Sequence, residues 1–203
     1  RLIKSMAPLF KISITLLLIC FNFNQKPNII QVKNNVYDIL YSQDFEQPLQ
    51  IKYDVQCNSK STTYFSRKGL NFYKIQNIHT SDDVDYLNNE YDKGHMAPAA
   101  DFNCDLNSLK LTFSYVNCAL QHRDLNRGQW KDLEAYEKEL AINNKVSIDI
   151  ILDFNGSIRN ATGAMIPVGF SKIISLNGKV FKSYYFPNQS VAGSFEKFLV
   201  KKY

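Results

Sequence analysis

The sequence predicts an α+β fold, with a central antiparallel sheet and flanking helices in a single domain. Several short segments alternate apolar and polar residues, as half-buried strands do, and one longer segment has helical periodicity. The chain has 203 residues, of which 45% are apolar and 21% charged. This composition is enough to bury a core and excludes a wholly disordered polypeptide. The 12 Tyr and 14 Phe residues further favour strands.

The strands follow from this alternation, after a polar lead-in over residues 26–36. Leu49 to Val55 shows the pattern plainly, with apolar side chains at every second position. Residues 79–90 carry many acids and asparagines but few apolar side chains, and are expected to form an exposed loop. Strands are expected at residues 49–55, 62–65, 70–75, 111–120, 146–154, 166–176 and 178–186.

Residues 124–142 form the long helix that the sequence predicts. Leu133, Tyr136 and Leu140 recur at helical spacing, with strong helix formers between them. Trp130, the only tryptophan, falls at a helical position that favours the core over a surface that stacks bases. Further along, Asn177-Gly178 between two strand-like runs predicts a hairpin turn.

The formal charge of the chain is +5 at neutral pH, but three of its basic residues precede residue 24. Without residues 1–23 the chain has 21 basic residues against 19 acidic ones, a formal charge of +2. Such a small net charge does not by itself attract nucleic acid. Any affinity for nucleic acid must therefore come from a local basic patch.

The first 25 residues resemble a secretory signal peptide. Lys11 precedes an apolar run, Ile12 to Cys20, that is shorter than the roughly 20 residues of a membrane span. We expect its removal, which leaves residues 26–203 as one domain, secreted or held in the secretory or endolysosomal lumen, without stable membrane association. A mitochondrial presequence is the alternative, but such segments are amphipathic and Arg-rich. Glycosylation sequons at Asn155, Asn160 and Asn188 suit the secretory route.

Three cysteines follow the predicted signal peptide, at positions 57, 104 and 118. An odd number is consistent with one disulfide and one free thiol, and we expect Cys104 to pair with Cys118. A zinc site made by His95, Cys104, Cys118 and His122 is the alternative, although the sequence has no C-x-x-C motif or tight His pair.

Two segments carry residues typical of a catalytic site. In Tyr91 to Asp101 (YDKGHMAPAAD), His95 follows a glycine and precedes small residues, which leaves its imidazole free to accept a proton from water. A lone histidine is otherwise more often structural. The second segment, Leu125 to Glu134 (LNRGQWKDLE), follows the first along the chain and lies at the start of the predicted helix.

Together these segments resemble the DNA/RNA non-specific endonucleases of the ββα-metal (His-Me finger) fold, a family that includes endonuclease G. The family patterns are D-R-G-H-x-x-P and N-x-G-x-W-x-x-L-E, and the resemblance extends over about residues 37–200. It implies an α+β fold with a ββα-metal catalytic motif. It also implies a metal-dependent hydrolase that cleaves phosphodiester bonds in DNA and RNA through contacts to the phosphate backbone.

The resemblance also implies a role for each matched residue. His95 would be the general base, and Asn126 the direct protein ligand of Mg²⁺, with Mn²⁺ as an alternative ion. Glu134 would belong to the water network of the metal, and Arg67 would contact the scissile phosphate. As local alternatives, Asn126 can be a helix N-cap, Glu134 a solvated helix carboxylate, and Arg67 part of a charged turn.

The sequence departs from the family pattern at two places. Lys93 stands where the family has Arg, which keeps a positive charge but loses the two-pronged grip on phosphate. Lys93 is still expected to bind substrate. Asn117 and Gln121 are expected to support substrate binding by hydrogen bonds, although the intervening residues 118–120 differ from the family form.

These departures leave a second function open, that of a catalytically inactive nucleic-acid-binding or interaction protein with the nuclease fold. A zinc-dependent protein that uses the Cys and His set is the third. The joint presence of His95, Asn126 and Glu134 favours the enzyme. Members of the family also form homodimers, and the sequence does not fix whether this chain does.

Overall fold

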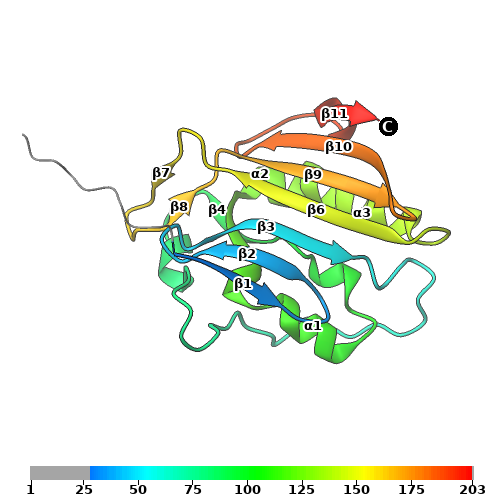
Figure 1. Cartoon of the computed structure of the whole chain (residues 1–203), viewed down its shortest axis with the longest axis horizontal. Helices are drawn as coiled ribbons and strands as arrows, with labels where there is room; N and C mark the ends of the chain where they lie inside the picture. The colour runs from blue at the N-terminus through cyan, green and yellow to red at the C-terminus, as the bar shows by residue number, and fades with distance from the viewer. Residues whose placement is uncertain (1–27, 203) are drawn as a thin grey trace, which may run out of the picture.

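A seven-stranded antiparallel sheet organises the computed structural model, which describes residues 28–202 (Figure 1). The predicted signal peptide, residues 1–25, lies outside the described residues. The strand order is β1-β2-β3-β6-β9-β10-β11, and the α+β fold is therefore confirmed. The sheet strands are β1 (Ile29–Lys33), β2 (Asp38–Ser42), β3 (Gln47–Asp54), β6 (Val146–Asp153), β9 (Gly169–Leu176), β10 (Lys179–Pro187) and β11 (Leu199–Lys202).

Four short strands form two smaller antiparallel pairs outside this sheet. They are β4 (Tyr91–His95) with β5 (Cys118–His122), and β7 (Ile158–Arg159) with β8 (Met165–Ile166). The helices are α1 (Leu106–Thr112), α2 (Arg123–Leu125), a π-helical turn (Asn126–Trp130), α3 (Lys131–Leu140) and the 3₁₀ helices Asp83–Tyr86, Ala99–Asp101, Tyr115–Asn117 and Phe195–Phe198. No helix among the described residues is both long and apolar enough to span a membrane.

The core lies between the sheet and the helices that cover one of its faces, with α3 behind β6, β9 and β10 in Figure 1. Trp130 is fully buried there, with its ring centroid 5.5 Å from that of Phe170 and 5.7 Å from that of Phe186. The prediction that this tryptophan belongs to the core is confirmed. A buried ion pair crosses the same interface, with Lys172 Nζ 3.0 Å from Glu137 Oε1.

The strongest alternating patterns do form strands, at β3, β6 and β10. The predicted hairpin between β9 and β10 is also present. Asn177 and Gly178 have φ values of 52° and 83°, the positive values that a two-residue hairpin turn of this kind requires.

Several other predictions of local structure are wrong or only partly right. Residues 26–36 contain the edge strand β1, whereas residues 62–65 form no strand, and residues 70–75 have only an isolated bridge from Tyr73 to Ser114. Residues 111–120 are divided between the end of α1, a 3₁₀ helix and β5. Residues 79–90 include a 3₁₀ helix with a buried Asp85. Alternation of apolar and polar residues indicates only a local preference for extended structure. A segment becomes a strand only where it also pairs with another strand.

The predicted continuous helix over residues 124–142 is also interrupted. α2 ends at Leu125, a π-helical turn follows, and α3 begins at Lys131. Gly128 has non-helical dihedrals (φ −106°, ψ −111°), and the chain kinks there. π-helical turns often occur at functional sites because they reorient single side chains.

The predicted disulfide between Cys104 and Cys118 is wrong. Cys57 pairs with Cys104, with their Cα atoms 5.7 Å apart, whereas Cys118 is a buried free thiol on β5. Two contacts of backbone N–H groups accompany this pairing: Cys57 N–H donates to Asp101 O at 2.8 Å, and Cys104 N–H points at Cys57 Sγ, 3.0 Å away. The disulfide closes the segment that carries Arg67 against the body of the protein.

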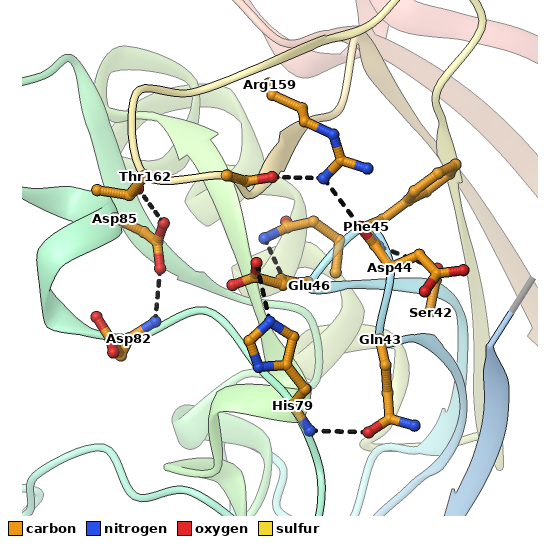
Figure 2. A network of polar contacts seen from close by, with 12 residues as sticks. Ser42, Gln43, Asp44, Phe45, Glu46, His79, Asp82, Asp85, Arg159 and Thr162 are labelled. Atoms are coloured by element: carbon orange, nitrogen blue, oxygen red, sulfur yellow. Dashed lines mark hydrogen bonds and ion pairs between the residues drawn. The ribbon is translucent and has the colours of Figure 1, made fainter.

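Polar contacts fix the loops at one end of the sheet (Figure 2). Arg159 donates to the backbone oxygens of Asp44 and Gly163, at 2.9 and 2.5 Å, and thereby ties the β7–β8 hairpin to the turn before β3. His79 Nε2 lies 3.2 Å from Glu46 Oε1 in that same turn. The residues that precede β4 are therefore held by the sheet.

Candidate active site

The two segments that the sequence singled out meet in one β-β-helix unit. β4 pairs with β5 in the register Lys93 with Leu120, Gly94 with Ala119 and His95 with Cys118. The chain then runs from β5 into α2 and the π-helical turn. Gly94 allows this pairing, because a Cβ atom there would lie 2.4 Å from Gln121 Oε1 and 2.6 Å from Gln121 Cβ.

His95 stands at the end of β4 between two aromatic rings. Its imidazole centroid lies 4.9 Å from that of Phe72 and 4.9 Å from that of Phe113. Nε2 is enclosed and has no hydrogen-bond partner among the described residues. Burial, with a smaller contribution from the positive charge of Arg67, lowers the pKa of His95 to about 4. At neutral pH the imidazole is therefore uncharged and able to accept a proton.

Glu134 lies on the first turn of α3 and lines the same cleft as His95. Burial raises its pKa to about 7, with the neighbouring carboxylate of Glu137 acting in the same direction. The positive charges of Lys172 and Arg67 act in the opposite direction. Arg67 lines the same cleft as His95 and Glu134.

Asn126 opens the π-helical turn and is oriented by Asp92 of β4. Its Nδ2 donates to Asp92 Oδ2 at 2.9 Å, and Arg127 grips the same carboxylate through Nε (2.8 Å) and Nη2 (2.7 Å). Burial favours a higher pKa for Asp92, but the bonds from Arg127 and Asn126 outweigh it and hold the pKa below its ordinary value. Because its amide nitrogen is used, Asn126 retains Oδ1 as a ligand atom.

These residues line one cleft with a volume of about 1170 Å³. Phe72, Phe113 and Leu70 form an apolar wall beside His95. The cationic residues of the lining outnumber the two acidic ones, Asp92 and Glu134. They are Arg67, Lys68, Lys93, Arg127 and Lys131. The lining is therefore a local basic patch of the kind that binding to nucleic acid would need.

The structure brings five of the seven predicted site residues into the cleft lining: Arg67, Lys93, His95, Asn126 and Glu134. The other two, Asn117 and Gln121, are fully buried behind it. Asn117 accepts from Ala97 N and donates to Ala97 O and Thr112 O, at 2.8 to 2.9 Å, and so holds the chain that follows His95. Gln121 packs against Gly94.

The alternative zinc set is not assembled. Cys104 is in the disulfide, and Cys118 accepts a contact from Tyr86 Oη at 3.4 Å. His122 caps α2 through Nδ1, which accepts from Asp124 N. Within residues 28–202, no three His, Cys, Asp or Glu side chains are grouped in a way that could hold a metal ion.

Asp92, Arg127, Phe72 and Phe113 also belong to the site, although the sequence motifs do not assign them a role. Asp92 and Arg127 lie inside the two motifs, adjacent to Lys93 and Asn126, so their positions were a usable signal. Phe72 and Phe113 come from distant segments, and their approach to His95 depends on the tertiary fold.

Comparison with known proteins identifies the family of the chain. A model of the family described as DNA/RNA non-specific endonuclease matches residues 20–202. The chain belongs to this family. Within the DNA/RNA non-specific endonucleases it is 35% identical over 66 residues to "Nuclease EXOG, mitochondrial" of Danio rerio, covering 32% of this chain and 19% of that protein. It is 37% identical over 73 residues to "Nuclease" of Nostoc sp. strain PCC 7120, covering 36% and 26%.

A third relative is "Endonuclease G, mitochondrial" of Bos taurus, with 30% identity over 78 residues, covering 37% of this chain and 26% of that protein. The matched segment spans only about a quarter or less of the length of these curated relatives. Among solved structures, a chain of the EndoG/EndoGI complex superposes with a TM-score of 0.71 and 22% identity. It covers 88% of this chain and 82% of that chain, which supports the shared fold.

Proposed function

We propose that the chain is a metal-dependent, non-specific endonuclease that hydrolyses phosphodiester bonds in DNA and RNA. One observation carries this proposal: His95, Arg67, Asn126 and Glu134 line a single cleft whose charged lining is mainly cationic. A neutral base, a ligand for a hard cation and a positive wall for phosphate together suit hydrolysis of a phosphodiester. Membership of the nuclease family supports it further.

The donor atoms of the cleft fit a magnesium ion. Asn126 Oδ1 would hold the ion, because the bond from Nδ2 to Asp92 leaves this oxygen as the remaining polar atom of the amide. Glu134, with its raised pKa, suits hydrogen bonds to water around the ion more than direct coordination. Mg²⁺ keeps much of its hydration shell and needs few protein ligands, and Mn²⁺ accepts the same oxygen donors. When bound, the cation would neutralise charge that develops on the phosphate.

The residues of the cleft divide the work of hydrolysis. The His95 imidazole accepts a proton from water, and the water oxygen forms a bond to phosphorus while the bond to the leaving oxygen breaks; the leaving oxygen then takes a proton from solvent. Arg67 holds the scissile phosphate and stabilises its added negative charge. The apolar wall of Phe72 and Phe113 keeps the imidazole uncharged and ready to accept the proton.

Low sequence specificity follows from the same lining. Cationic side chains contact the phosphate backbone, which is common to all sequences, whereas specificity requires contacts to base edges. The second candidate function is an inactive nucleic-acid-binding protein. The ion pair of Lys93 with Asp83 favours this second candidate. In the family pattern a cation at this position would bind substrate, whereas here it is paired with an acid of the protein.

The compartment also belongs to this proposal. The Cys57–Cys104 disulfide suits an oxidising environment and hence the secretory route. Asn155 is exposed, whereas Asn160 and Asn188 use both polar atoms of their amides in hydrogen bonds, so Asn155 is the sequon best placed for a glycan. Two relatives carry "mitochondrial" in their names, and that route is the alternative. Detection of the protein in medium, with and without glycosidase treatment, separates the two.

The proposed activity is tested by incubating residues 26–203 with supercoiled plasmid and with RNA, in magnesium and in EDTA. We expect cleavage of both substrates in magnesium, none in EDTA, and a loss of at least about 100-fold in Asn126→Ala, consistent with removal of a metal ligand. Folding of the variant is checked by circular dichroism. Failure of the folded wild type to cleave either substrate would favour the inactive nucleic-acid-binding protein.

A further inference from the structure

Lys93 is enclosed by aromatic rings and paired with an acid. Its Nζ lies 5.4 Å from the ring centroid of Phe72, 5.6 Å from that of Tyr115 and 5.9 Å from that of Tyr86. It also makes a short ion pair with Asp83. The lysine side chain is 29% exposed, whereas the Asp83 side chain is 74% exposed. The ammonium thus occupies a cage that satisfies its charge within the protein.

Asp83 is placed firmly enough to hold this cation. It lies on the 3₁₀ helix Asp83–Tyr86, whose N-terminus is closed by a capping box between Asp82 and Asp85. The Asp85 carboxylate is buried and accepts from Asp82 N at 2.7 Å, from Asn160 Nδ2 at 3.0 Å and from Thr162 Oγ1, as Figure 2 shows for Asp82 and Thr162. The network described above therefore extends to the acid that pairs with Lys93.

The cage is continuous with the wall of the catalytic histidine. Phe72 contacts Lys93 on one side and the His95 imidazole, 4.9 Å away, on another. Tyr115 packs on Phe72 with ring centroids 5.5 Å apart, and its hydroxyl donates to Asp83. The positions of the Lys93 cation, the Asp83 carboxylate and the Phe72 ring are therefore coupled.

We propose that Lys93 is a positioning residue: paired with Asp83, its ammonium holds Phe72 against His95 and does not bind substrate phosphate. This proposal rests on the proposed nuclease function and revises the role that the family pattern implies for this position. Lys93 lines the cleft, but its charge is already balanced by the Asp83 carboxylate and by the surrounding aromatic rings. Lys68 and Lys131 line the same cleft, and among residues 28–202 no ion pair with an acid is recorded for either. These are the lysines available to phosphate.

The salt dependence of binding separates the two roles. A lysine that contacts phosphate contributes about one unit to the slope of log affinity against log salt. We would measure binding of a labelled DNA duplex by fluorescence anisotropy from 50 to 200 mM salt, in EDTA to prevent cleavage. Lys93→Gln should leave the slope unchanged, and Lys68→Gln should reduce it by about one unit. A reduction of about one unit in Lys93→Gln would overturn the proposal.

Kinetics in magnesium give the second readout. Lys93→Gln should lower kcat by about tenfold or more with little change in KM, because a displaced catalytic base slows chemistry without weakening binding. Lys93→Arg should restore most of kcat, since Arg can pair with Asp83 and lie over an aromatic ring. Asp83→Asn should resemble Lys93→Gln, whereas the control Asp82→Asn keeps its capping oxygen and should not. Tighter DNA binding by Asp83→Asn would instead show that Asp83 withholds Lys93 from substrate.

A third measurement does not depend on activity. The chain has three histidines, so the imidazole signals of His95 are readily assigned by NMR. In Lys93→Gln the NMR signals of His95 should shift, and the pKa of His95 should rise towards that of an exposed histidine. The NMR signals of His79 and His122 should stay where they are in the wild type. Unaltered His95 signals would contradict the proposal even in a protein that cleaves nothing. An inactive wild type with shifted signals would contradict only the nuclease function.

Discussion

The protonation states of two cleft residues differ in a way that determines the pH dependence of the reaction. His95 is enclosed by Phe72 and Phe113, and its pKa of about 4 leaves it neutral at any pH near neutrality. Glu134 is half-buried, and burial raises its pKa to about 7, so that its charged form dominates only above that pH. The proposed base, His95, is therefore uncharged well below the pH at which the Glu134 carboxylate becomes charged.

We predict that the acid limb of the kcat/KM profile belongs to Glu134. Activity should fall as pH decreases through about 7, because protonation removes the charge that, in the proposed mechanism, would order water around the metal. Higher magnesium concentrations should move this limb to lower pH, since the cation favours the charged carboxylate. Glu134→Gln should be slower and lack the limb. Persistence of the same limb in this variant would assign it to another group.

Asp92 provides a second prediction, because it orients the proposed metal ligand. Asp92→Asn weakens the grip of Arg127 and removes the charge that fixes the Asn126 amide. The magnesium concentration for half-maximal activity should rise by roughly 10- to 100-fold, as is usual when a partner of a metal ligand is lost. Asp124→Asn is the control, because it removes a nearby negative charge that makes no hydrogen bond to the Asn126 side chain. An unchanged magnesium requirement would exclude Asp92 from this role.

At the scale of elements, the sequence predicted those strands and turns that a local pattern of residues determines. β3, β6 and β10 alternate strongly and form strands, and Asn177-Gly178 makes the expected turn. Residues 62–65 and 70–75 were also expected to be strands, but within residues 28–202 they pair with no strand of the sheet. Their one bridge there joins Tyr73 to Ser114, and the segment that contains them is closed by the disulfide. The π-helical turn was not predictable from periodicity, since a kink at Gly128 leaves the apolar spacing of α3 intact.

The candidate site was predictable to a similar extent. The motifs indicated His95, Asn126 and Glu134, and all three line the cleft. The aromatic wall was not predictable, because Phe72 and Phe113 approach His95 from other segments of the chain. The pairing of Lys93 with Asp83 was not predictable either, because it depends on how the intervening loop folds back. Asn117 was singled out from its motif, but its fully buried position and its bonds to Ala97 and Thr112 could be learned only from the fold.

The disulfide is an element whose removal should affect stability and activity together. It joins residues 47 positions apart and closes the segment that presents Arg67 to the cleft. The double variant Cys57→Ser/Cys104→Ser should lose about 2–5 kcal/mol in the free energy of unfolding. It should also lose kcat/KM at temperatures where it remains folded, because Arg67 is less well held. Urea unfolding and cleavage assays measure the two effects.

Cys118→Ser is the matched control for this experiment, since Cys118 is a free thiol. It should retain the disulfide and keep kcat/KM close to wild type. Reduction of the wild type with dithiothreitol should reproduce the double variant. Full activity after complete reduction would mean that the segment around Arg67 is held by its other contacts.

At the scale of the whole molecule, α3 is joined to the sheet by a buried charge pair within an apolar core. Lys172 and Glu137 are both fully buried, 3.0 Å apart, and Lys172 Nζ lies 4.3 Å from the centroid of the Trp130 ring. Lys172→Met leaves the Glu137 charge without its partner and should cost about 3–5 kcal/mol. Adding Glu137→Gln should recover much of this loss, because no unpaired charge remains. Equal stabilities of the single and double variants, from urea unfolding, would contradict this coupling.

The central claim is that His95 acts as the base in a metal-dependent cleavage of nucleic acid, and chemical rescue tests it most directly. His95→Gly should cleave supercoiled plasmid in magnesium at least about 100-fold more slowly than wild type, as expected for loss of a general base. Added imidazole should restore part of the rate, with a dependence on the concentration of neutral imidazole, while Asn126→Ala gains nothing. Cleavage by His95→Gly at the wild-type rate, or equal stimulation of both variants by imidazole, would contradict the account.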